Sequence, residues 1–374
     1  MMMGELDAQK LCLMKEKLNS IAELGYEENK TSLYVKQILL ESKPDLLNEY
    51  DTGIVATYFP EKEKRVDRPN ILLRAELDAL KLADGTIRHV CGHDAHMAIL
   101  LLLSKYILKN RKQMCATVKL LFQPAEEVCA GAKTMIKQGV LENPEVEECY
   151  AIHFTNELPL GTIALSKRPM SSGAQFEILI SGKTAHSAMP HMGNDCILLA
   201  ATIIQKLNTI VSRNISPTEN AVLTIAQVHG GNADNCLASR VILTGTIRYF
   251  NDEVKNSILD IMGKICKNEA ECMGVEIRVK CIEKVPFMNN NDEVMEKAKE
   301  IVQAERLIVD SNYQSMCVDD FAEFLKLRKG AYIMIGCQKN EPNYPLHSEK
   351  FYVDDEGLLS GYLILKNIIK RSVL

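Results

Sequence analysis

The first half of the sequence alternates amphipathic segments with short apolar runs. Apolar residues recur near helical spacing between residues 6 and 21, and a cap at Thr31 or Ser32 is expected to open a second helix that runs through Leu40. Strands are predicted at three short apolar runs, residues 71–74, 118–122 and 150–152. The alternation continues to about Ser166 and is typical of an α/β domain with a mainly parallel sheet covered on both faces.

The order of elements changes from about residue 173. The pattern there predicts two helices against a four-stranded antiparallel sheet, with strands at 175–181, 221–228, 241–250 and 276–281 and helices at 194–211 and 252–272. The polar stretch 288–292 marks a return to the first domain, which closes with a strand at 331–337 and a helix at 355–370. The sequence therefore predicts a main domain of residues 1–172 and 285–374 and an inserted α+β domain of residues 173–284.

Composition indicates a soluble globular protein. The 374 residues are 47% apolar and 25% charged, which is ordinary for a chain with two sizeable cores. The formal charge of -5 comes with no basic block, so a nucleic-acid partner is not expected. The start of the chain lacks a signal-peptide pattern, and the apolar run 98–103 is too short for a membrane span, so we expect a cytoplasmic protein without a membrane partner. The twelve cysteines then read as reduced thiols.

The segment from His89 to His96 holds three of the eight histidines, one cysteine and one aspartate within eight residues. Cys91 and His93 point to one side of an extended segment, and His93 and His96 fit one face of a first helical turn. Thiolate and imidazole together suit zinc and similar divalent ions, whereas magnesium and calcium prefer oxygen. The alternative is a helix start capped by Asp94 with histidines that bind no metal. The further candidate ligands favour the metal.

Glu126 and Glu127 directly follow the predicted strand at 118–122. In open α/β sheets ligands gather at the carboxyl ends of the strands, and two adjacent carboxylates are costly to bury there unless a cation or proton neutralises them. Because adjacent side chains diverge, one carboxylate can bind a metal while the other faces a metal-bound water as a base. The alternative is a solvated acidic turn before a helix.

His153 and His347 are two further candidate ligands. A lone histidine after a strand is more often structural than a ligand. Here, however, three predicted strands each lead into acidic or imidazole side chains, so we expect their ends to converge on one site.

With these motifs the sequence resembles the M20 peptidases, and within them the aminoacylase-like amidohydrolases that cleave N-acyl amino acids. The similarity covers nearly the whole chain and runs in order through residues 74–80, 91–96, 122–127, 151–153, 182–190, 231–235, 245–248, 319–321 and 346–348. The resemblance implies an α/β fold, with a mainly parallel-sheet metallopeptidase catalytic domain and an inserted α+β lid domain.

The resemblance also implies a site for two divalent metal ions per chain, of zinc, manganese, nickel or cobalt. Its implied ligands, with a bridging thiolate, are Cys91, His93, Glu127, His153 and His347. Glu126 is then the general base, and Asp78 is the carboxylate that orients a ligand from outside the metal's own shell.

Three residues of the inserted domain match family positions that act on the substrate. His186 resembles a lid histidine that polarises the scissile carbonyl, often across a dimer interface, and Asn235 and Arg248 resemble substrate contacts. On the residues alone, His186 and Asn235 also fit polar turns, and Arg248 also fits an exposed charge on a strand. The resemblance favours a homodimer formed through the lid domain.

The sequence departs from the family pattern at three places. Asn19 and Ala22 replace a histidine and the proline of a Pro-Glu pair, the segment between Leu80 and His89 is short, and Asp319 stands where glutamate is usual. None of the five implied metal ligands is lost.

The predicted function is hydrolysis of the amide bond of a small N-acyl amino acid, such as an acetyl or benzoyl derivative, by a metal-activated water. An N-acetyl-diamino acid deacetylase and a dipeptidase of the same family are alternatives. A catalytically silent metal-binding homologue is the alternative from another class, although it would have no need for Glu126. A redox or structural zinc protein is disfavoured because the sequence has no Cys-x-x-Cys.

Overall fold

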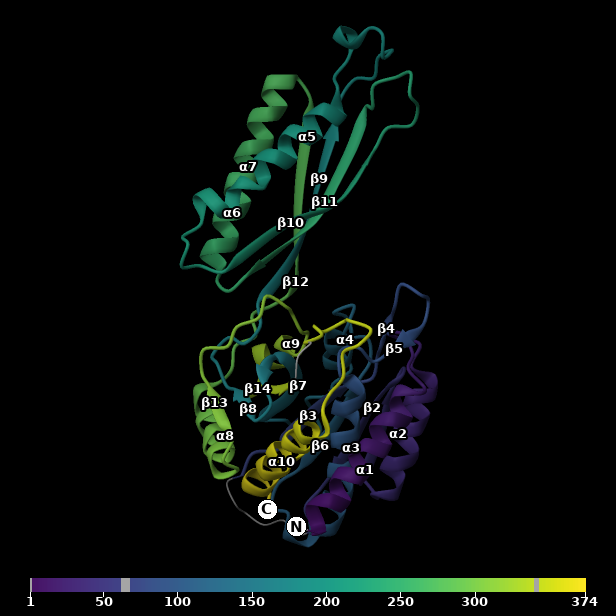
Figure 1. Cartoon of the computed structure of the whole chain (residues 1–374), viewed down its shortest axis with the longest axis vertical. Coiled ribbons are helices and arrows are strands. Elements are labelled where there is room, and N and C mark those ends of the chain that lie inside the picture. The colour runs from purple at the N-terminus through teal and green to yellow at the C-terminus, as the bar shows by residue number, and fades with distance from the viewer. Residues whose placement is uncertain (1, 62–67, 340–342) are drawn as a thin grey trace. The chain divides into compact units, whose positions relative to one another are not determined.

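The computed structural model describes residues 2–61, 68–339 and 343–374, and the chain divides into two compact units (Figure 1). Unit 1 comprises Met1–Pro169, Met288–Gln314 and Asp319–Leu374, and unit 2 comprises Met170–Phe287 and Ser315–Val318. The predicted inserted domain, 173–284, starts and ends three residues inside the main stretch of unit 2. The short segment 315–318 was not expected there, because it returns to unit 2 from a distant part of the chain.

Unit 1 is built on an eight-stranded sheet that is mainly parallel, as predicted. Its order is β1 (Leu46–Tyr50), β2 (Gly53–Tyr58), β6 (Val118–Gln123), β3 (Ile71–Glu76), β7 (Glu148–Pro159), β14 (Lys329–Gln338), β8 (Thr162–Ala164) and β13 (Ile308–Asp310). The central strands β6, β3, β7 and β14 are parallel neighbours. All residues of β2, β3 and β6 are buried, and for this reason they read as short apolar runs rather than as alternating ones.

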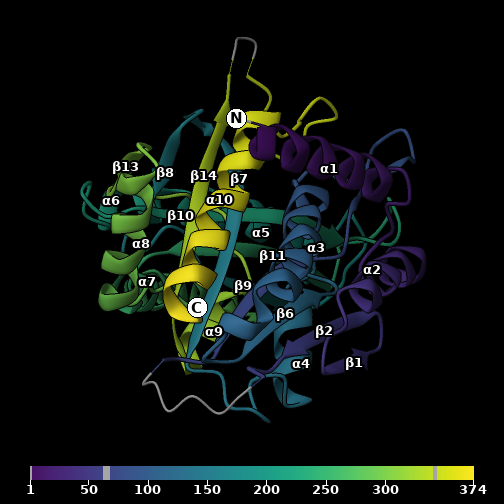
Figure 2. The same cartoon turned by 90° about the horizontal axis from the view of Figure 1, so that it is seen from below.

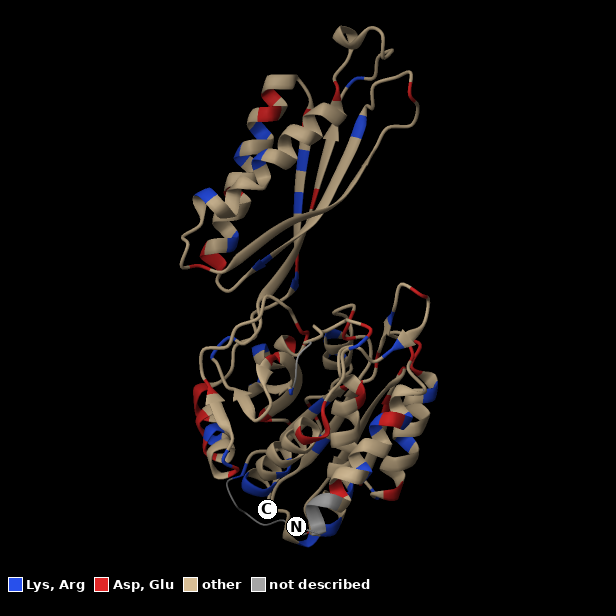
Figure 3. Ribbon diagram, in the orientation of Figure 1, with Lys and Arg blue, Asp and Glu red and all other residues tan. Residues whose placement is uncertain are grey.

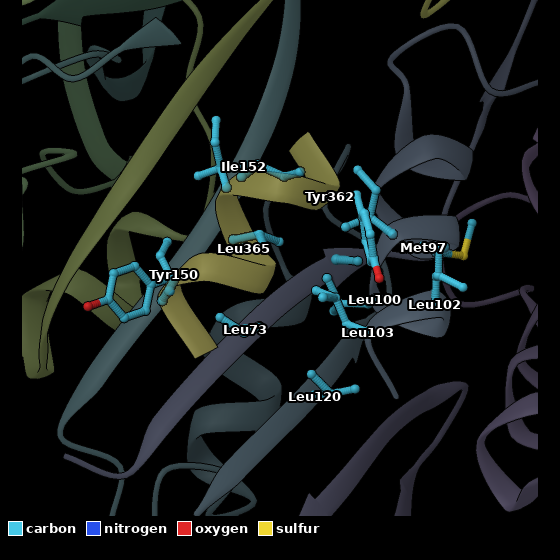
Figure 4. Packing of buried hydrophobic residues seen from close by; sticks show 14 of the residues in the cluster. Leu73, Met97, Leu100, Leu102, Leu103, Leu120, Tyr150, Ile152, Tyr362 and Leu365 are labelled. Atoms are coloured by element: carbon cyan, nitrogen blue, oxygen red, sulfur yellow. The ribbon is translucent and has the colours of Figure 1, made fainter. Parts of the chain in front are cut away.

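Helices cover this sheet (Figure 2). α3 (His93–Asn110) packs on β3, and α10 (Asp355–Ser372) packs on β14 and on α3; further out lie α1 (Met2–Asn19), α2 (Asn29–Glu41) and α8 (Asp292–Ala304). The core between them joins Leu73 and Ile152 of the sheet to Leu100 of α3 and Leu365 of α10 (Figure 4). Two short helices, α4 (Gly131–Lys137) and α9 (Ala322–Leu327), pack on β6 and β14.

The predicted start of the second helix was wrong. α2 begins at Asn29 rather than after a cap at Thr31 or Ser32. The Glu23 carboxylate accepts hydrogen bonds from the backbone N–H groups of Lys30 and Thr31, at 2.8 and 2.9 Å. A side chain outside the helix therefore satisfies the first-turn donors, and no local cap is needed.

Unit 2 has the predicted four-stranded antiparallel sheet, in the order β10 (Ala221–Gly230), β11 (Arg240–Tyr249), β9 (Ser172–Ser181) and β12 (Glu276–Val285). One face carries α5 (Cys196–Leu207), α6 (Thr209–Asn214) and α7 (Asp252–Met273). The helix predicted over 194–211 is present as α5 and α6, which are separated only at Asn208, where the backbone keeps right-handed helical dihedral angles. The Asn208 side chain donates to the Ile204 carbonyl and so competes with the helical hydrogen bonds.

The surface of unit 2 is apolar on part of α5. By length and composition, Cys196–Asn214 is apolar enough to cross a membrane, but only 33% of that window is buried and it is divided between two helices. Ile197 and Leu198 are 52% and 60% exposed, although the opposite face of α5 packs on the sheet. Charged residues of both signs occur along α7 in unit 2 and along α8 in unit 1 (Figure 3).

Candidate metal centre

The carboxyl ends of three parallel strands bring the predicted site residues of unit 1 together. Asp78 follows β3, Glu126 and Glu127 follow β6, and His153 lies within β7. Cys91 and His93 lie at the start of α3, which packs against β3. Because β6, β3 and β7 are parallel neighbours, their carboxyl ends share one edge of the sheet.

Five side chains form two sets of potential ligands that share the Cys91 thiol. One set is Cys91, His93 and His153, and the other is Cys91, Glu127 and His347; the ligand atoms of each set lie within 4.8 Å of one another. Cys91 Sγ is 3.5 Å from Nε2 of His153, and Nε2 of His347 is 3.6 Å from Oε2 of Glu127. The Cys91 sulfur belongs to both sets and could therefore serve as a ligand in either of them.

Backbone carbonyls set the tautomers of the two buried histidine ligands. Nδ1 of His93 donates to the Asp78 carbonyl at 2.9 Å, and Nδ1 of His153 donates to the Phe154 carbonyl at 2.7 Å. Each ring therefore carries its proton on Nδ1 and presents the Nε2 lone pair toward the cluster. This is the arrangement that a metal-binding histidine needs.

Asp78 connects two of these ligands, as a carboxylate in an orienting role would. Its Oδ2 accepts a hydrogen bond from the backbone N–H of Glu127 at 2.9 Å, and its Oδ1 lies 3.4 Å from Nδ1 of His93. The side chain is fully buried. Asp78 thus fixes the positions of Glu127 and His93 relative to each other without being a ligand itself.

The donor set fits divalent cations. Among the described residues, Nε2 of His93 and Oε1 of Glu127 are buried without a hydrogen-bond partner, and they lie 4.0 Å apart. Burial, together with nearby Glu127 and Glu126, raises the pKa of the Cys91 thiol well above its ordinary value. A cation would supply the missing partner and stabilise the thiolate. One thiolate, three imidazoles and a carboxylate suit zinc and similar borderline ions.

Glu126 lies between the metal-ligand candidates and two aspartates, and one of its carboxylate oxygens is within 4.8 Å of ligand atoms of His93 and Glu127. Its Oε2 lies 3.8 Å from Nε2 of His93, and a carboxylate oxygen lies within 4.8 Å of one on Asp319 and one on Asp320. Burial and these two aspartates raise the pKa of the Glu126 carboxyl well above its usual range. No hydrogen bond to its side chain exists within the described residues. Glu126 therefore differs from Glu127 in also facing Asp319 and Asp320, and its role as a base stays a prediction.

The backbone is left-handed at two positions beside the site. Ala125 has φ 54°, and its N–H donates to Glu28 at 2.9 Å. His347 has φ 67°, and its N–H donates to the Val90 carbonyl at 2.9 Å. Such conformations are uncommon for residues with a side chain, and each needs surrounding contacts to persist. Here these contacts aim Glu126 and His347 at the cluster.

The three residues predicted to contact substrate lie in unit 2, in two separate places. The backbone N–H of Ala188 donates to Nδ1 of His186 at 3.1 Å, so the His186 proton is on Nε2. Asn235 is near it, because its carbonyl accepts from the N–H of Ser187 at 3.0 Å. Arg248 instead pairs with Gly173, at the other end of β9. The eight residue steps from Gly173 to Ser181 alone correspond to about 26 Å.

Comparison with known proteins places the chain in a family. The family model described as peptidase family M20/M25/M40 matches residues 72–371. The chain belongs to this peptidase family. It is therefore by class a metal-dependent amide hydrolase.

Relatives of the M20 chain match along almost its whole length. An N-acetyl-L-cysteine deacetylase of Bacillus subtilis is 30% identical over 96% of this chain and 87% of that protein. Thermostable carboxypeptidase 1 of Saccharolobus solfataricus is 30% identical over 94% and 92%. The crystal structure of a dinuclear metal-binding M20 peptidase from Bacillus subtilis has a TM-score of 0.82 and 26% identity, over 98% of this chain and 99% of that one.

The M20 chain also contains a buried charge network that was not predicted from the sequence. Arg74 is fully buried and donates to Glu76, to Asp319 at 2.9 and 3.1 Å, and to Asp320 at 3.0 Å. Gln123 and Tyr332 complete its shell. The sequence feature that could have predicted this network is the charge of Arg74, because an arginine in a largely apolar strand must find buried partners.

The departures of the M20 chain from the family pattern have local structural counterparts. Asn19 donates to the Asp94 carboxylate at 3.0 Å, at the end of α1 and the start of α3. The shortened segment forms a two-stranded hairpin of β4 (Leu80–Lys81) and β5 (Ile87–Arg88). Asp319 accepts from both Arg74 and Tyr332, so the shorter acid still reaches its partners.

Proposed function

We propose that this protein hydrolyses the amide bond of N-acyl amino acids with two divalent ions bound per chain. The observation that carries the proposal is the pair of ligand sets joined at Cys91, with Glu126 beside them and free of hydrogen bonds within the described residues. The relative named as a deacetylase of N-acetyl-L-cysteine supports an N-acyl amino acid as the substrate class.

Bound cations at this donor set supply Lewis acidity, which polarises a carbonyl and makes water a better nucleophile. The protein's own part is proton transfer. Glu126 takes one proton from the attacking water and delivers it to the nitrogen of the leaving amine as the C–N bond breaks. The products are a carboxylic acid and a free amino acid.

The tautomer of His186 supports a role as a hydrogen-bond donor. With Nδ1 accepting from Ala188, the exposed ring has its Nε2–H available for the oxygen of a scissile carbonyl. A single donor of this kind contributes about 3 to 4 kcal/mol to the stability of a transition state. Arg248 is suited to the substrate carboxylate, because a guanidinium pairs with a carboxylate through two parallel hydrogen bonds.

The separation of these residues supports a homodimer. An N-acyl amino acid is about two residues long, or about 7 Å, so it cannot reach both His186 and Arg248 of one unit 2. A second chain can supply the missing group. β10 is an edge strand, and Val228 on it is 54% exposed, as are Ile197 and Leu198 on α5 at 52% and 60%. Edge strands and apolar patches of this kind are places where a second copy binds.

One relative favours a second candidate substrate. The carboxypeptidase from Saccharolobus solfataricus is as similar to this chain as the deacetylase is, so a short peptide is the alternative to an acylated amino acid. A catalytically silent protein is disfavoured, because a buried Glu126 without hydrogen bonds within the described residues costs stability, and the two ligand sets that share Cys91 do not need it.

A substrate panel tests the proposal. Protein stripped with a chelator is reloaded with zinc, manganese, cobalt or nickel and assayed with N-acetyl amino acids, an N-acetyl diamino acid, benzoylglycine and dipeptides. We expect release of free amino acid only after reloading, and fastest from an N-acetyl amino acid. Fastest cleavage of a dipeptide would favour the peptidase. Protein that holds two ions per chain and hydrolyses none of these substrates would be the silent homologue.

A further inference from the structure

The guanidinium of Arg248 occupies the space beside Gly173. The two residues are directly opposite each other in the antiparallel pair β11 and β9, so their side-chain positions share one face of the sheet. A Cβ atom built on Gly173 would lie 2.3 Å from Nη1 of Arg248 and 3.2 Å from Cγ1 of Val318. Carbon and nitrogen atoms that are not bonded to each other cannot approach so closely, so any side chain at position 173 must displace the guanidinium.

Nothing in the backbone requires glycine at this position. Gly173 does not have the left-handed φ that marks six other glycines of the described chain, and the irregularity in the pairing beside it, between Glu283 and Val285, is on β12 and not on β9. Glycine inside a strand is unfavourable unless another group approaches closely. The atom that approaches here is the end of a flexible side chain, so a larger residue would move Arg248 rather than the sheet.

Arg248 has an unsatisfied charge. Within the part of the chain that the structure describes, its half-buried guanidinium makes no hydrogen bond and no ion pair. A partly buried cation without a partner is suited to an anionic ligand, and a guanidinium held flat offers two parallel N–H groups to a carboxylate.

We propose that Gly173 determines specificity by letting Arg248 lie across strand β9 in the position that takes the α-carboxylate of the substrate. The inference rests on the proposed function, since it assigns the carboxylate of the N-acyl amino acid to this guanidinium. Gly173 touches no reacting atom and acts only through Arg248. Its effect is therefore expected on recognition of the free carboxylate and not on the cleavage step.

The test compares an acid and its amide. The best N-acetyl amino acid of the panel and the same compound with its α-carboxylate converted to a carboxamide are assayed for acetate release. We expect Gly173→Ala to raise the KM for the acid at least tenfold, to leave kcat within about twofold, and to leave the amide unaffected. Arg248→Met is expected to lose the same preference for the acid. Gly263→Ala, on α7 with no atom near its added Cβ, is the matched control and keeps wild-type values.

The double variant separates a specific effect from general damage. If Gly173 acts through Arg248, adding Gly173→Ala to Arg248→Met changes nothing further. The inference would be overturned, while the proposed function stands, by either of two results. One is a further rise in the KM for the acid in the double variant, as large as the rise that Gly173→Ala causes alone. The other is a wild-type preference for the acid in Gly173→Ala. A wild-type protein that cleaves neither compound with metal bound would overturn both.

Discussion

Mixing two inactive variants should restore activity if His186 acts across a dimer. In His186→Ala the chain keeps Glu126, and in Glu126→Gln it keeps His186. A dimer with one chain of each kind has one site with both groups and one site with neither. Random exchange of equal amounts makes half of the dimers hybrid, so the mixture should reach about one quarter of the wild-type rate.

The expected recovery is far larger than the residual activity of either variant alone. Loss of one oxyanion donor lowers turnover by about 10²- to 10³-fold, and loss of a general base by about 10²- to 10⁴-fold. The expectation comes from the distance of more than about 26 Å that separates Arg248 from His186 along β9, which one small substrate cannot span.

The assay measures kcat for the best N-acetyl amino acid after the two variants are incubated together. Native mass spectrometry of differently tagged chains verifies that subunits have exchanged. His191→Ala is the matched control, because His191 is an exposed histidine of the same segment and should keep the wild-type rate. Hybrid dimers that form without any recovered activity would refute action across the dimer, and a wild-type rate in His186→Ala alone would refute the role of His186 itself.

Three further predictions concern metal, base and pH. Cys91→Ala should lose at least one of about two bound ions together with activity, whereas Cys272→Ala, at an exposed position of α7, should keep both ions. The metal content is measured by elemental analysis after gel filtration. Full metal occupancy in Cys91→Ala would contradict a bridging role of the Cys91 thiolate. Glu126→Gln should keep both ions while kcat falls by about 10²- to 10⁴-fold; a wild-type kcat removes the base from the reaction. Burial lowers the pKa of Lys119 to about 8, from 10.5, so between these values this side chain binds more protons in the unfolded chain and its own contribution to the free energy of unfolding should rise with pH. Other buried groups titrate in the same pH range, so the test is the difference in urea unfolding between wild type and Lys119→Met: wild type should gain up to about 1 kcal/mol per pH unit relative to the variant, and parallel pH curves would contradict it.

Four of the five candidate ligands could be singled out from local patterns, whereas His347 and the complete set came from the family resemblance. Cys91 and His93 are two residues apart, and Glu127 and His153 directly follow or end apolar runs. The network around Arg74 could not be predicted from local patterns, because its partners Asp319 and Asp320 are more than 240 residues away in sequence. Pairing across that distance depends on the strand order, which periodicity does not reveal.

Local sequence patterns also gave a wrong prediction where a hydrogen-bond partner came from a distant residue instead of an adjacent one. The start of α2 is capped by Glu23 from outside the helix, so the search for a cap among adjacent residues placed it wrongly. The position of Arg248 over Gly173 depends on strand register, because only the pairing of β11 with β9 brings residues 75 positions apart into contact. A family resemblance can suggest which residues act, but the register decides what holds them in place.

The short segment 315–318 links the two units along the chain. Its residues belong to unit 2, where Ser171 bonds to the carbonyls of Ser315 and Cys317, and the next two residues, Asp319 and Asp320, belong to unit 1. Those aspartates are fixed by Arg74 and lie against Glu126. A single peptide link therefore joins unit 2 to the carboxylates beside the base. The segment that Ser171 holds in unit 2 is thus continuous along the chain with the carboxylates that set the electrostatic surroundings of Glu126.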